Sequence, residues 1–284
     1  MSDLRILTVQ DISCVGQCSL TVALPILSAC GIETAILPSA VLSTHTAGFS
    51  GYTVRDLTDD MPAIAAHWKK EGLAFDAFYT GYLGSARQID YVQDIFATLG
   101  RGRALKIVDP AMADQGKLYP AFDLAYVEAM KPLCRAADVI VPNITEAALL
   151  TGLPYREAYD ESYVAALLDA LEAQGIGTIV LTGVGYRPDE TGVAVRQGQK
   201  TDYYPHRYIA PGCHGTGDVY ASALTGALLR GLSPFEAAKL AADFTVLCIE
   251  KTQGDPDHWY GVKFEKAIPE LIQLLDQATG ASGL

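Results

Sequence analysis

The sequence lacks any run of about 18 apolar residues, the length that a membrane-spanning helix needs. Its first residues, Met1-Ser2-Asp3-Leu4-Arg5, also lack the basic and apolar regions of a secretory signal. From these absences we expect a cytoplasmic protein with no membrane partner. Half of the 284 residues are hydrophobic and 19% are charged, so a large core is expected and disorder is not.

Clustered metal ligands and basic residues are also scarce. The six cysteines form no Cys-x-x-Cys pair and the five histidines do not gather beside them, so we expect free thiols and no structural zinc. There are 21 Lys and Arg against 33 Asp and Glu, a net charge of −12, which argues against nucleic acid as a partner. Backbone N–H groups, a helix end and Mg²⁺ can still bind phosphates in such a chain.

Two phosphate-binding fingerprints are missing. No Gly-x-x-x-x-Gly-Lys-[Ser/Thr] sequence occurs, which excludes a P-loop. The segment after the first predicted strand, Gln10–Gly16, has one glycine, which disfavours a Rossmann-type oxidoreductase. Gly183-Val184-Gly185 is a weak partial match and is interpreted as a loop.

Short buried runs alternate with helical stretches along the chain. Strands are predicted at Leu4–Val9, Glu33–Leu37, Phe75–Thr80, Ala104–Val108, Val139–Val141 and Thr178–Leu181, with a β pair at Gly192–Arg196 and Thr201–Tyr208. Helices are predicted at Leu20–Cys30, Thr58–Glu71, Ala86–Leu99, Ala121–Cys134, Thr145–Thr151, Ser162–Gln174, Gly217–Arg230, Pro234–Lys251 and Phe264–Gln277. This alternation predicts a single α/β domain over residues 1–284, with a mostly parallel sheet covered by helices on both faces.

The most informative segment is Pro211-Gly212-Cys213-His214-Gly215-Thr216-Gly217-Asp218, which enters a helix of small residues. Backbone N–H groups at such a helix start are free to bind an anion. Asp218 could be an ordinary first-turn residue, but beside an anion site it can also accept a proton. We therefore predict that Gly215, Thr216 and Gly217 hold a phosphoryl group while Asp218 is the base.

Acidic residues follow two other predicted strands. Asn143 and Glu146 lie on one face at a helix start, where they could form a capping box or serve water-coordinated Mg²⁺; both interpretations remain open. Asp109 and Asp114 share one loop and could either be solvated or bind a ligand. Because the carboxyl ends of parallel strands meet at one edge of a sheet, we expect a ligand site there.

Together, these segments resemble the ribokinase-like superfamily and, within it, the pyridoxal kinases, over nearly the whole chain. The motifs that carry the resemblance occur in the family's order: Ser43-Thr44-His45-Thr46, Gly81-Tyr82-Leu83-Gly84-Ser85, Asp109-Pro110-Ala111-Met112, Asn143-Ile144-Thr145-Glu146 and Gly215-Thr216-Gly217-Asp218. The Thr44-His45-Thr46 and Gly81–Ser85 motifs point to the vitamin B6 branch. The Asn143–Glu146 and Gly215–Asp218 motifs mark only the superfamily.

The resemblance implies ATP- and Mg²⁺-dependent phosphorylation of the 5′-hydroxymethyl group of a B6 vitamer by a homodimer, assisted by a monovalent cation such as K⁺. It implies a role for each motif residue. Asp218 is the base beside the Gly215–Gly217 anion hole, Asp109 and Glu146 serve the metal, Asn143, Thr182 and Asp114 serve ATP, and Thr46 and Tyr82 contact the vitamer.

One residue departs from the family's pattern. Many relatives carry a serine that contacts the substrate ring where this chain has Asp11. Asp11 could stabilise a pyridinium or attract the amine of pyridoxamine, or it could point away while Ser13 takes the contact; both readings are open. We hypothesise that Asp11 shifts the preference among vitamers.

Two other functions fit the same features less well. A hydroxymethylpyrimidine kinase shares the fold, but its branch often has Cys in place of the final acid of the Gly-rich motif. A noncatalytic vitamer or nucleotide carrier would not need a base at Asp218.

Overall fold

The computed structural model describes residues 4–210 and 213–280, and the chain divides into two compact units. Unit 1 is formed by Met1–Leu57 together with Ile209–Leu284, and unit 2 is Thr58–Tyr208. A single domain over 1–284 stays a prediction. Each unit is described by itself below.

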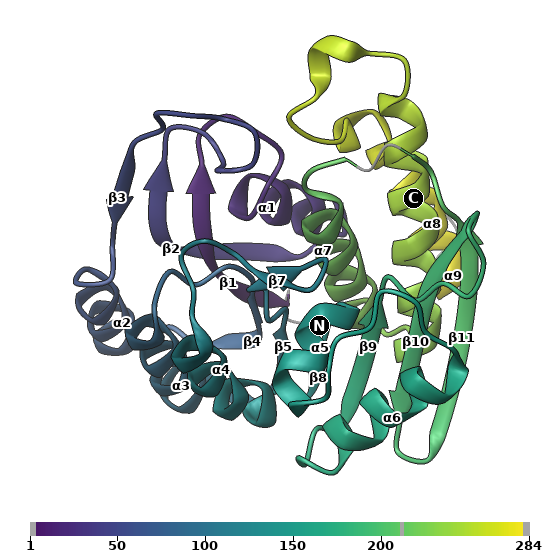
Figure 1. Ribbon diagram of the computed structural model, residues 1–284. Helices are drawn as coiled ribbons and strands as arrows, with labels where there is room; N and C mark the ends of the chain where they lie inside the picture. The colour runs from purple at the N-terminus through teal and green to yellow at the C-terminus, as the bar shows by residue number, and fades with distance from the viewer. Residues whose placement is uncertain (1–3, 211–212, 281–284) are drawn as a thin grey trace. The chain divides into compact units, whose positions relative to one another are not determined.

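Unit 1 is built on parallel strands with helices beside them (Figure 1). Its elements are β1 (Arg5–Ser13), α1 (Leu20–Ala29), β2 (Glu33–Leu42), β3 (Val54–Asp56), α7 (Thr216–Leu229), α8 (Pro234–Thr252), the 3₁₀ turns η1 (Pro256–His258) and η2 (Phe264–Lys266), and α9 (Ile268–Thr279). β1 pairs with β2 in parallel, and β3 adds to β2 in the antiparallel sense. Ile6, Leu7 and Val9 on β1 are fully buried, as expected for a strand that is covered on both faces.

The small residues of α7 allow a close approach to helix α1. A Cβ atom on Gly226 would lie 2.4 Å from Cys30 Sγ, just after the end of α1. This close contact is between two helices. Ser222, Ala223 and Ala227 on α7 are fully buried.

Unit 2 contributes more strands to the sheet than unit 1, and most of their pairings are parallel. Its elements are α2 (Met61–Lys70), β4 (Phe75–Thr80), α3 (Ala86–Leu99), β5 (Gly100–Val108), β6 (Ala113–Asp114), β7 (Lys117–Leu118), α4 (Leu124–Ala136), β8 (Val139–Ile140), α5 (Ile144–Thr151), α6 (Glu161–Glu172), β9 (Thr178–Thr182), β10 (Glu190–Gln197) and β11 (Lys200–Arg207). The strands follow the order β11-β10-β9-β8-β5-β4. The β4–β5, β5–β8 and β8–β9 pairs are parallel, and β10 and β11 form the predicted hairpin at one edge. Helices α3 and α4 pack on β5, whereas α5 and α6 pack on β9.

The predicted α/β class with a mostly parallel sheet is confirmed, and the differences concern ends and short elements. The helix predicted at Phe264–Gln277 is wrong as one piece: it divides into η2 and α9 on either side of Ala267. Pro269 explains the break, because proline has no N–H to donate and is accepted in the first turn of a new helix. In the same way Pro62 lies in the first turn of α2, so this helix begins at Met61 rather than Thr58.

Two findings concern the cysteines and the lengths of the helices. All six cysteines lie in the described part of the chain and are free thiols. Across residues 4–210 and 213–280, no helix combines the length and the apolar character needed to cross a membrane.

Candidate active site

The turn before α7 has a backbone that only glycine accepts. Gly215 precedes the helix with φ 79° and ψ 0°, and a Cβ atom there would lie 1.7 Å from the carbonyl oxygen of Gln17. Thr216 Oγ1 donates to the carbonyl of Cys213 at 3.3 Å, which closes the turn. Pro211 and Gly212 of the predicted motif lie outside the described residues. The turn thus brings the first N–H groups of a 14-residue helix to its surface.

Gly217 is a glycine for a different reason. It is exposed, its φ is not positive, and a Cβ atom there would meet no atom within 4 Å. The fold itself would therefore accept a side chain at this position. The open space in front of a positive helix end is what an anionic ligand requires.

Asp218 lies in the first turn of α7, where its ionisation is strongly perturbed. The residue is half-buried, and burial raises the pKa of its carboxyl to about 7. A hydrogen bond from the Ser19 N–H opposes this rise in pKa, and the charge of Asp11 adds to it. A carboxyl with a pKa near neutrality can both accept and release a proton at physiological pH.

Asp11 stands beside Asp218 in unit 1 and is held by two hydroxyl groups. It lies where the register of β1 on β2 shifts, between Gln10 and Ile12, and it is 5% exposed. Ser19 Oγ donates to Asp11 Oδ1 at 2.5 Å, and Ser13 Oγ donates to Asp11 Oδ2 at 3.1 Å. Burial raises the pKa of Asp11, and these two hydrogen bonds partly offset that rise. The structure therefore brings Asp11 and Ser13 together with the proposed base.

Thr46 is exposed on the loop after β2, and its neighbour His45 anchors that loop. His45 is 4% exposed; its Nδ1 accepts from the Ala47 N–H at 3.2 Å, so its proton is on Nε2, 2.7 Å from the carbonyl oxygen of Tyr260. Gly16 makes room for the ring, since a Cβ atom there would lie 2.1 Å from His45 Cδ2. The loop that carries Thr46 is thus tied to two other segments of unit 1.

In unit 2, Asn143 and Glu146 form a complete capping box at the start of α5. Asn143 Oδ1 accepts from the Glu146 N–H at 2.9 Å, and Glu146 Oε2 accepts from the Asn143 N–H at 2.9 Å. The capping interpretation of this pair is therefore confirmed. Glu146 is 2% exposed, which is unusual for a capping-box acid, since such residues mostly lie at the surface.

The same two residues anchor the loop that carries Asp114. Glu146 Oε1 accepts from the N–H groups of Met112 and Ala113 at 3.0 and 3.4 Å, and Asn143 Nδ2 donates to the carbonyl of Ala113 at 2.8 Å. Burial raises the pKa of Glu146 to about 8, three backbone hydrogen bonds oppose the rise, and the charge of Asp114 adds to it. Glu146 therefore connects the helix to the loop through its carboxyl.

The other residues predicted in unit 2 lie on neighbouring elements. Asp109 is nearly buried at the end of β5, and Asp114 is exposed on the short β6–β7 hairpin, which the sequence did not predict. Thr182 ends β9 and pairs with Asn143 in an isolated parallel bridge. Thr182 and Asn143 are thus brought together at the carboxyl ends of β8 and β9.

Tyr82 is half-buried after β4 and belongs to an aromatic group that sequence reasoning missed. Its ring lies 5.2 Å from that of Phe122, which in turn stacks on Tyr126 at 3.9 Å. Tyr126 donates its hydroxyl proton to the carbonyl of Leu83 at 2.6 Å, which fixes the Gly81–Ser85 loop. A lone aromatic residue in sequence gives no signal of such a partner.

These residues fit Mg²⁺ as an ion that keeps part of its water. Asp109 and Glu146 supply carboxylate oxygens, the ligand type that Mg²⁺ prefers. The described residues contain no group of three or more His, Cys, Asp and Glu arranged around one point, so a cage made only of protein is not formed there. An ion bound by one or two carboxylates together with substrate phosphates suits this donor set.

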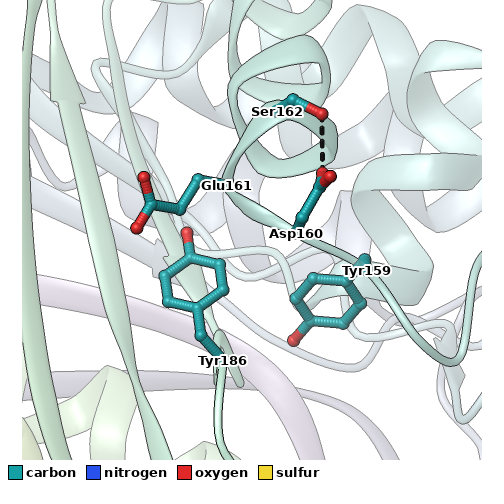
Figure 2. A pocket seen from close by; sticks show the side chains of 5 residues that line it. All are labelled: Tyr159, Asp160, Glu161, Ser162 and Tyr186. Atoms are coloured by element: carbon teal, nitrogen blue, oxygen red, sulfur yellow. Dashed lines mark hydrogen bonds between the residues drawn. The ribbon is translucent and has the colours of Figure 1, made fainter.

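A surface pocket in unit 2 includes none of the predicted residues (Figure 2). It is lined by Tyr159, Asp160, Glu161, Ser162 and Tyr186. Asp160 is already used to start α6, because its Oδ1 accepts from the Tyr163 N–H at 3.0 Å and from Ser162 Oγ at 2.6 Å. Asp160 and Ser162 serve helix capping, and the Tyr159 hydroxyl bonds the Gly183–Gly185 loop, so we assign no chemistry to this pocket.

Comparison with known proteins identifies the class of this fold. The profile of the phosphomethylpyrimidine kinase family matches residues 27–261. A hydroxymethylpyrimidine/phosphomethylpyrimidine kinase of Bacillus subtilis is 30% identical over 222 residues, which cover 76% of this chain and 78% of that protein. The crystal structure of pyridoxal kinase from Lactobacillus plantarum superposes with a TM-score of 0.89 at 35% identity and covers 96% of this chain and 98% of that one.

A third relative links the two substrate names. A Bacteroides thetaiotaomicron protein, assigned provisionally as a phosphomethylpyrimidine kinase and crystallised with pyridoxal, has a TM-score of 0.89 at 38% identity, covering 95% of this chain and 96% of that one. The fold and these relatives define an enzyme that phosphorylates an alcohol group, as predicted. The chain belongs to the phosphomethylpyrimidine kinase family, and the resemblance to ribokinase-like pyridoxal kinases is confirmed.

Proposed function

We propose that this enzyme transfers the γ-phosphoryl group of ATP to the 5′-hydroxymethyl group of pyridoxal, pyridoxine or pyridoxamine, giving the 5′-phosphate and ADP. The observation that carries the proposal is Asp218, a carboxyl with a pKa of about 7 in the first turn of α7. The pyridoxal kinase of Lactobacillus plantarum and the pyridoxal-bound Bacteroides protein support the choice of substrate.

The chemistry assigned to unit 1 is proton acceptance and anion binding. Asp218 takes the proton of the attacking hydroxyl as the new O–P bond forms and the bond between the β-phosphate bridging oxygen and the γ-phosphorus breaks. The N–H groups of Gly215, Thr216 and Gly217 bind the phosphoryl oxygens, whose charge a helix N-terminus stabilises. Asp11, Ser13 and Thr46 are proposed to lie at the vitamer.

The chemistry assigned to unit 2 concerns the nucleotide. Asn143, Thr182 and Asp114 are proposed to bind ATP, and Tyr82 the vitamer ring. Asp109 is proposed to hold Mg²⁺ and Glu146 to orient a metal-bound water, because both oxygens of Glu146 already accept backbone N–H groups. When bound, the ion would neutralise charge on the phosphates.

Hydroxymethylpyrimidine is a second candidate substrate, since the matching family and the Bacillus subtilis relative carry that name. It has the same reacting group, a hydroxymethyl on an aromatic ring. The base and the anion site would serve it unchanged.

The decisive experiment measures phosphate transfer from ATP to pyridoxal, pyridoxine, pyridoxamine and hydroxymethylpyrimidine, with wild type and Asp218→Asn side by side. We expect the highest kcat/KM for a B6 vitamer and a loss of roughly 10²–10⁴-fold in kcat for the variant, with ATP affinity retained. A preference for the pyrimidine would select the second candidate. Tight vitamer binding without transfer would identify a carrier, and near wild-type kcat in the variant would remove Asp218 as the base.

The remaining features of the proposal rest on the family. We propose a cytoplasmic homodimer that needs Mg²⁺ and is assisted by K⁺. Activity titrations with each ion and the mass of the enzyme in solution test these points.

A further inference from the structure

Ser19 has a backbone conformation that a serine rarely adopts. Its φ of 54° and ψ of −130° make it one of two non-glycine residues with positive φ in the described part of the chain. It is 4% exposed and stands directly before α1. Such conformations are disfavoured and persist where surrounding contacts enforce them.

Ser19 also gives up the usual role of its position. Serine before a helix normally accepts a hydrogen bond from the first turn of that helix, yet Ser19 makes no such bond. Its hydroxyl instead donates to Asp11 Oδ1 at 2.5 Å. Its N–H donates to Asp218. One residue thus connects the proposed base to a second buried carboxylate.

Asp11 is placed to hold Ser19 in this conformation. The register shift of β1 at Asp11 re-aims its side chain, as such irregularities in strands do. Ile12 pairs with Ser19 in an isolated antiparallel bridge, so the two segments are also joined through the backbone. The hydroxyl bond to Asp11 restrains the side chain of Ser19, beside the N–H that donates to Asp218.

We propose that Asp11 and Ser19 are positioning residues for the phosphoryl-transfer step: Asp11 binds the Ser19 hydroxyl, and the strained Ser19 backbone thereby directs its N–H to Asp218 and orients the base. This inference rests on the proposed function, since it takes Asp218 as the base. It assigns Asp11 a task that needs no contact with the vitamer ring.

The charged and titratable groups around this pair are few. Asp11 faces Asp218, and its charge raises the pKa of that carboxyl. His45 faces Asp11 and would lower the pKa of that carboxyl when its ring is protonated, whereas the thiol of Cys18 stays neutral because burial and both carboxylates raise its pKa. His214 lies against His45, with ring centroids 5.6 Å apart. Removing the charge of Asp11 should therefore favour the ionised form of Asp218.

The first test separates the hydroxyl bond from the strain by comparing Ser19→Ala with Ser19→Gly. Alanine has the same difficulty in adopting a positive φ, but it lacks the hydroxyl that bonds Asp11. We therefore expect kcat to fall by about tenfold or more, as it does when a catalytic group is misplaced. Glycine adopts the conformation without strain, so kcat should stay within about threefold of wild type. The KM for the vitamer should change little in both. Equal losses in the two variants, or a larger loss in Ser19→Gly, would overturn the proposal.

A second test uses Asp11 and does not depend on whether the Ser19 variants fold. Asp11→Asn keeps an oxygen that can accept from Ser19 but removes the charge, so it should retain more kcat than Asp11→Ala, and the acid limb of its kcat–pH profile should move to lower pH. Asp11→Ala loses the bond to Ser19 and should lose kcat to a similar extent as Ser19→Ala. If Asp11→Ala instead raises only the vitamer KM, Asp11 contacts the ring and the positioning role is wrong.

Ser233→Ala is the matched control, because Ser233 also precedes a helix in unit 1 but does cap it, with Oγ accepting from the Glu236 N–H. This variant should lower the melting temperature and leave kcat and its pH profile unchanged. Asp218→Asn measured in parallel separates two claims: that Asp218 is the base, and that Asp11 and Ser19 position it. Retained kcat in Asp218→Asn removes the base and the positioning role together, whereas a large loss there with unchanged Ser19 and Asp11 variants removes only the positioning role.

Discussion

Asp218 should make the folded protein less stable at neutral pH than it would be with a neutral residue in its place. Burial raises the pKa of its carboxyl from 3.8 to about 7, which means that the folded state disfavours the ionised form. Asp218→Asn removes this ionisation and keeps an oxygen that can accept from the Ser19 N–H. We therefore expect the variant that loses catalysis to gain stability.

The sign and size of this gain follow from the two pKa values. Because the folded-state pKa is raised, the contribution of Asp218 to stability is fully present below pH 4 and is lost as the pH rises through about 7. The pKa of Asp218 is about 7 in the folded protein and 3.8 for a free side chain. At about 1.4 kcal/mol per pKa unit, this difference corresponds to a loss of about 4 kcal/mol in the free energy of unfolding when the carboxyl ionises. Since part of the residue is open to solvent, we expect about 2 kcal/mol at pH 8.

The assay is the free energy of unfolding by urea of wild type and Asp218→Asn between pH 4 and pH 8. The two proteins should be similar at pH 4, and the advantage of the variant should grow up to about pH 7 and then level off. Contributions from Glu146 cancel in this difference, because both proteins contain that residue. The reasoning would be refuted if the stability difference between the variant and wild type did not change with pH, or if the variant were less stable at pH 8. Either result would mean that burial of the Asp218 carboxylate does not destabilise the folded protein.

Three further substitutions test other parts of the structure. Gly217→Ala should unfold like wild type, because its Cβ atom meets no atom within 4 Å, and should lose roughly tenfold in kcat/KM for ATP in steady-state kinetics. Glu146→Ala leaves buried N–H groups without partners and should cost about 3 kcal/mol in urea unfolding, with a much smaller loss for Glu236→Ala in the exposed capping box of α8. Gly226→Ala should cost about 1–3 kcal/mol, because its Cβ atom would lie 2.4 Å from Cys30 Sγ. That cost should be smaller in a Cys30→Ala background, and equal costs in both backgrounds would contradict the packing.

The sequence predicted the long helices and strands well. In each of them the spacing of apolar residues matches either a helix or a strand, and not both. It missed β3 and the β6–β7 hairpin, since Val54–Asp56 is exposed and two-residue strands have no periodicity. Among the proposed site residues, Gly215 and Asp218 follow from the sequence itself, because a glycine turn and an acid adjoin a helix of small residues. Thr46 and Tyr82 are proposed through the resemblance.

Ser19 could not be found in this way. A serine before an apolar helix predicts an ordinary cap, and nothing local indicates a positive φ. Ser19 is bonded to Asp11, eight residues earlier, and to Asp218, far along the chain, and our proposal ties its φ to these two partners. A residue whose role is set by two distant partners gives no signal in a single sequence.

Asp11, Asp218 and Glu146 share a design that explains how an acidic protein can perform this chemistry. Asp11 is held by the hydroxyls of Ser13 and Ser19, Asp218 by a backbone N–H, and Glu146 by backbone N–H groups of its own cap and the neighbouring loop. A lysine or arginine in these places would hold the carboxyl pKa values well below neutrality, and a base with such a pKa has little tendency to take a proton. In our proposal, neutral donors orient the Asp218 carboxyl while burial raises its pKa, so that the base is both fixed in direction and able to accept a proton near neutral pH.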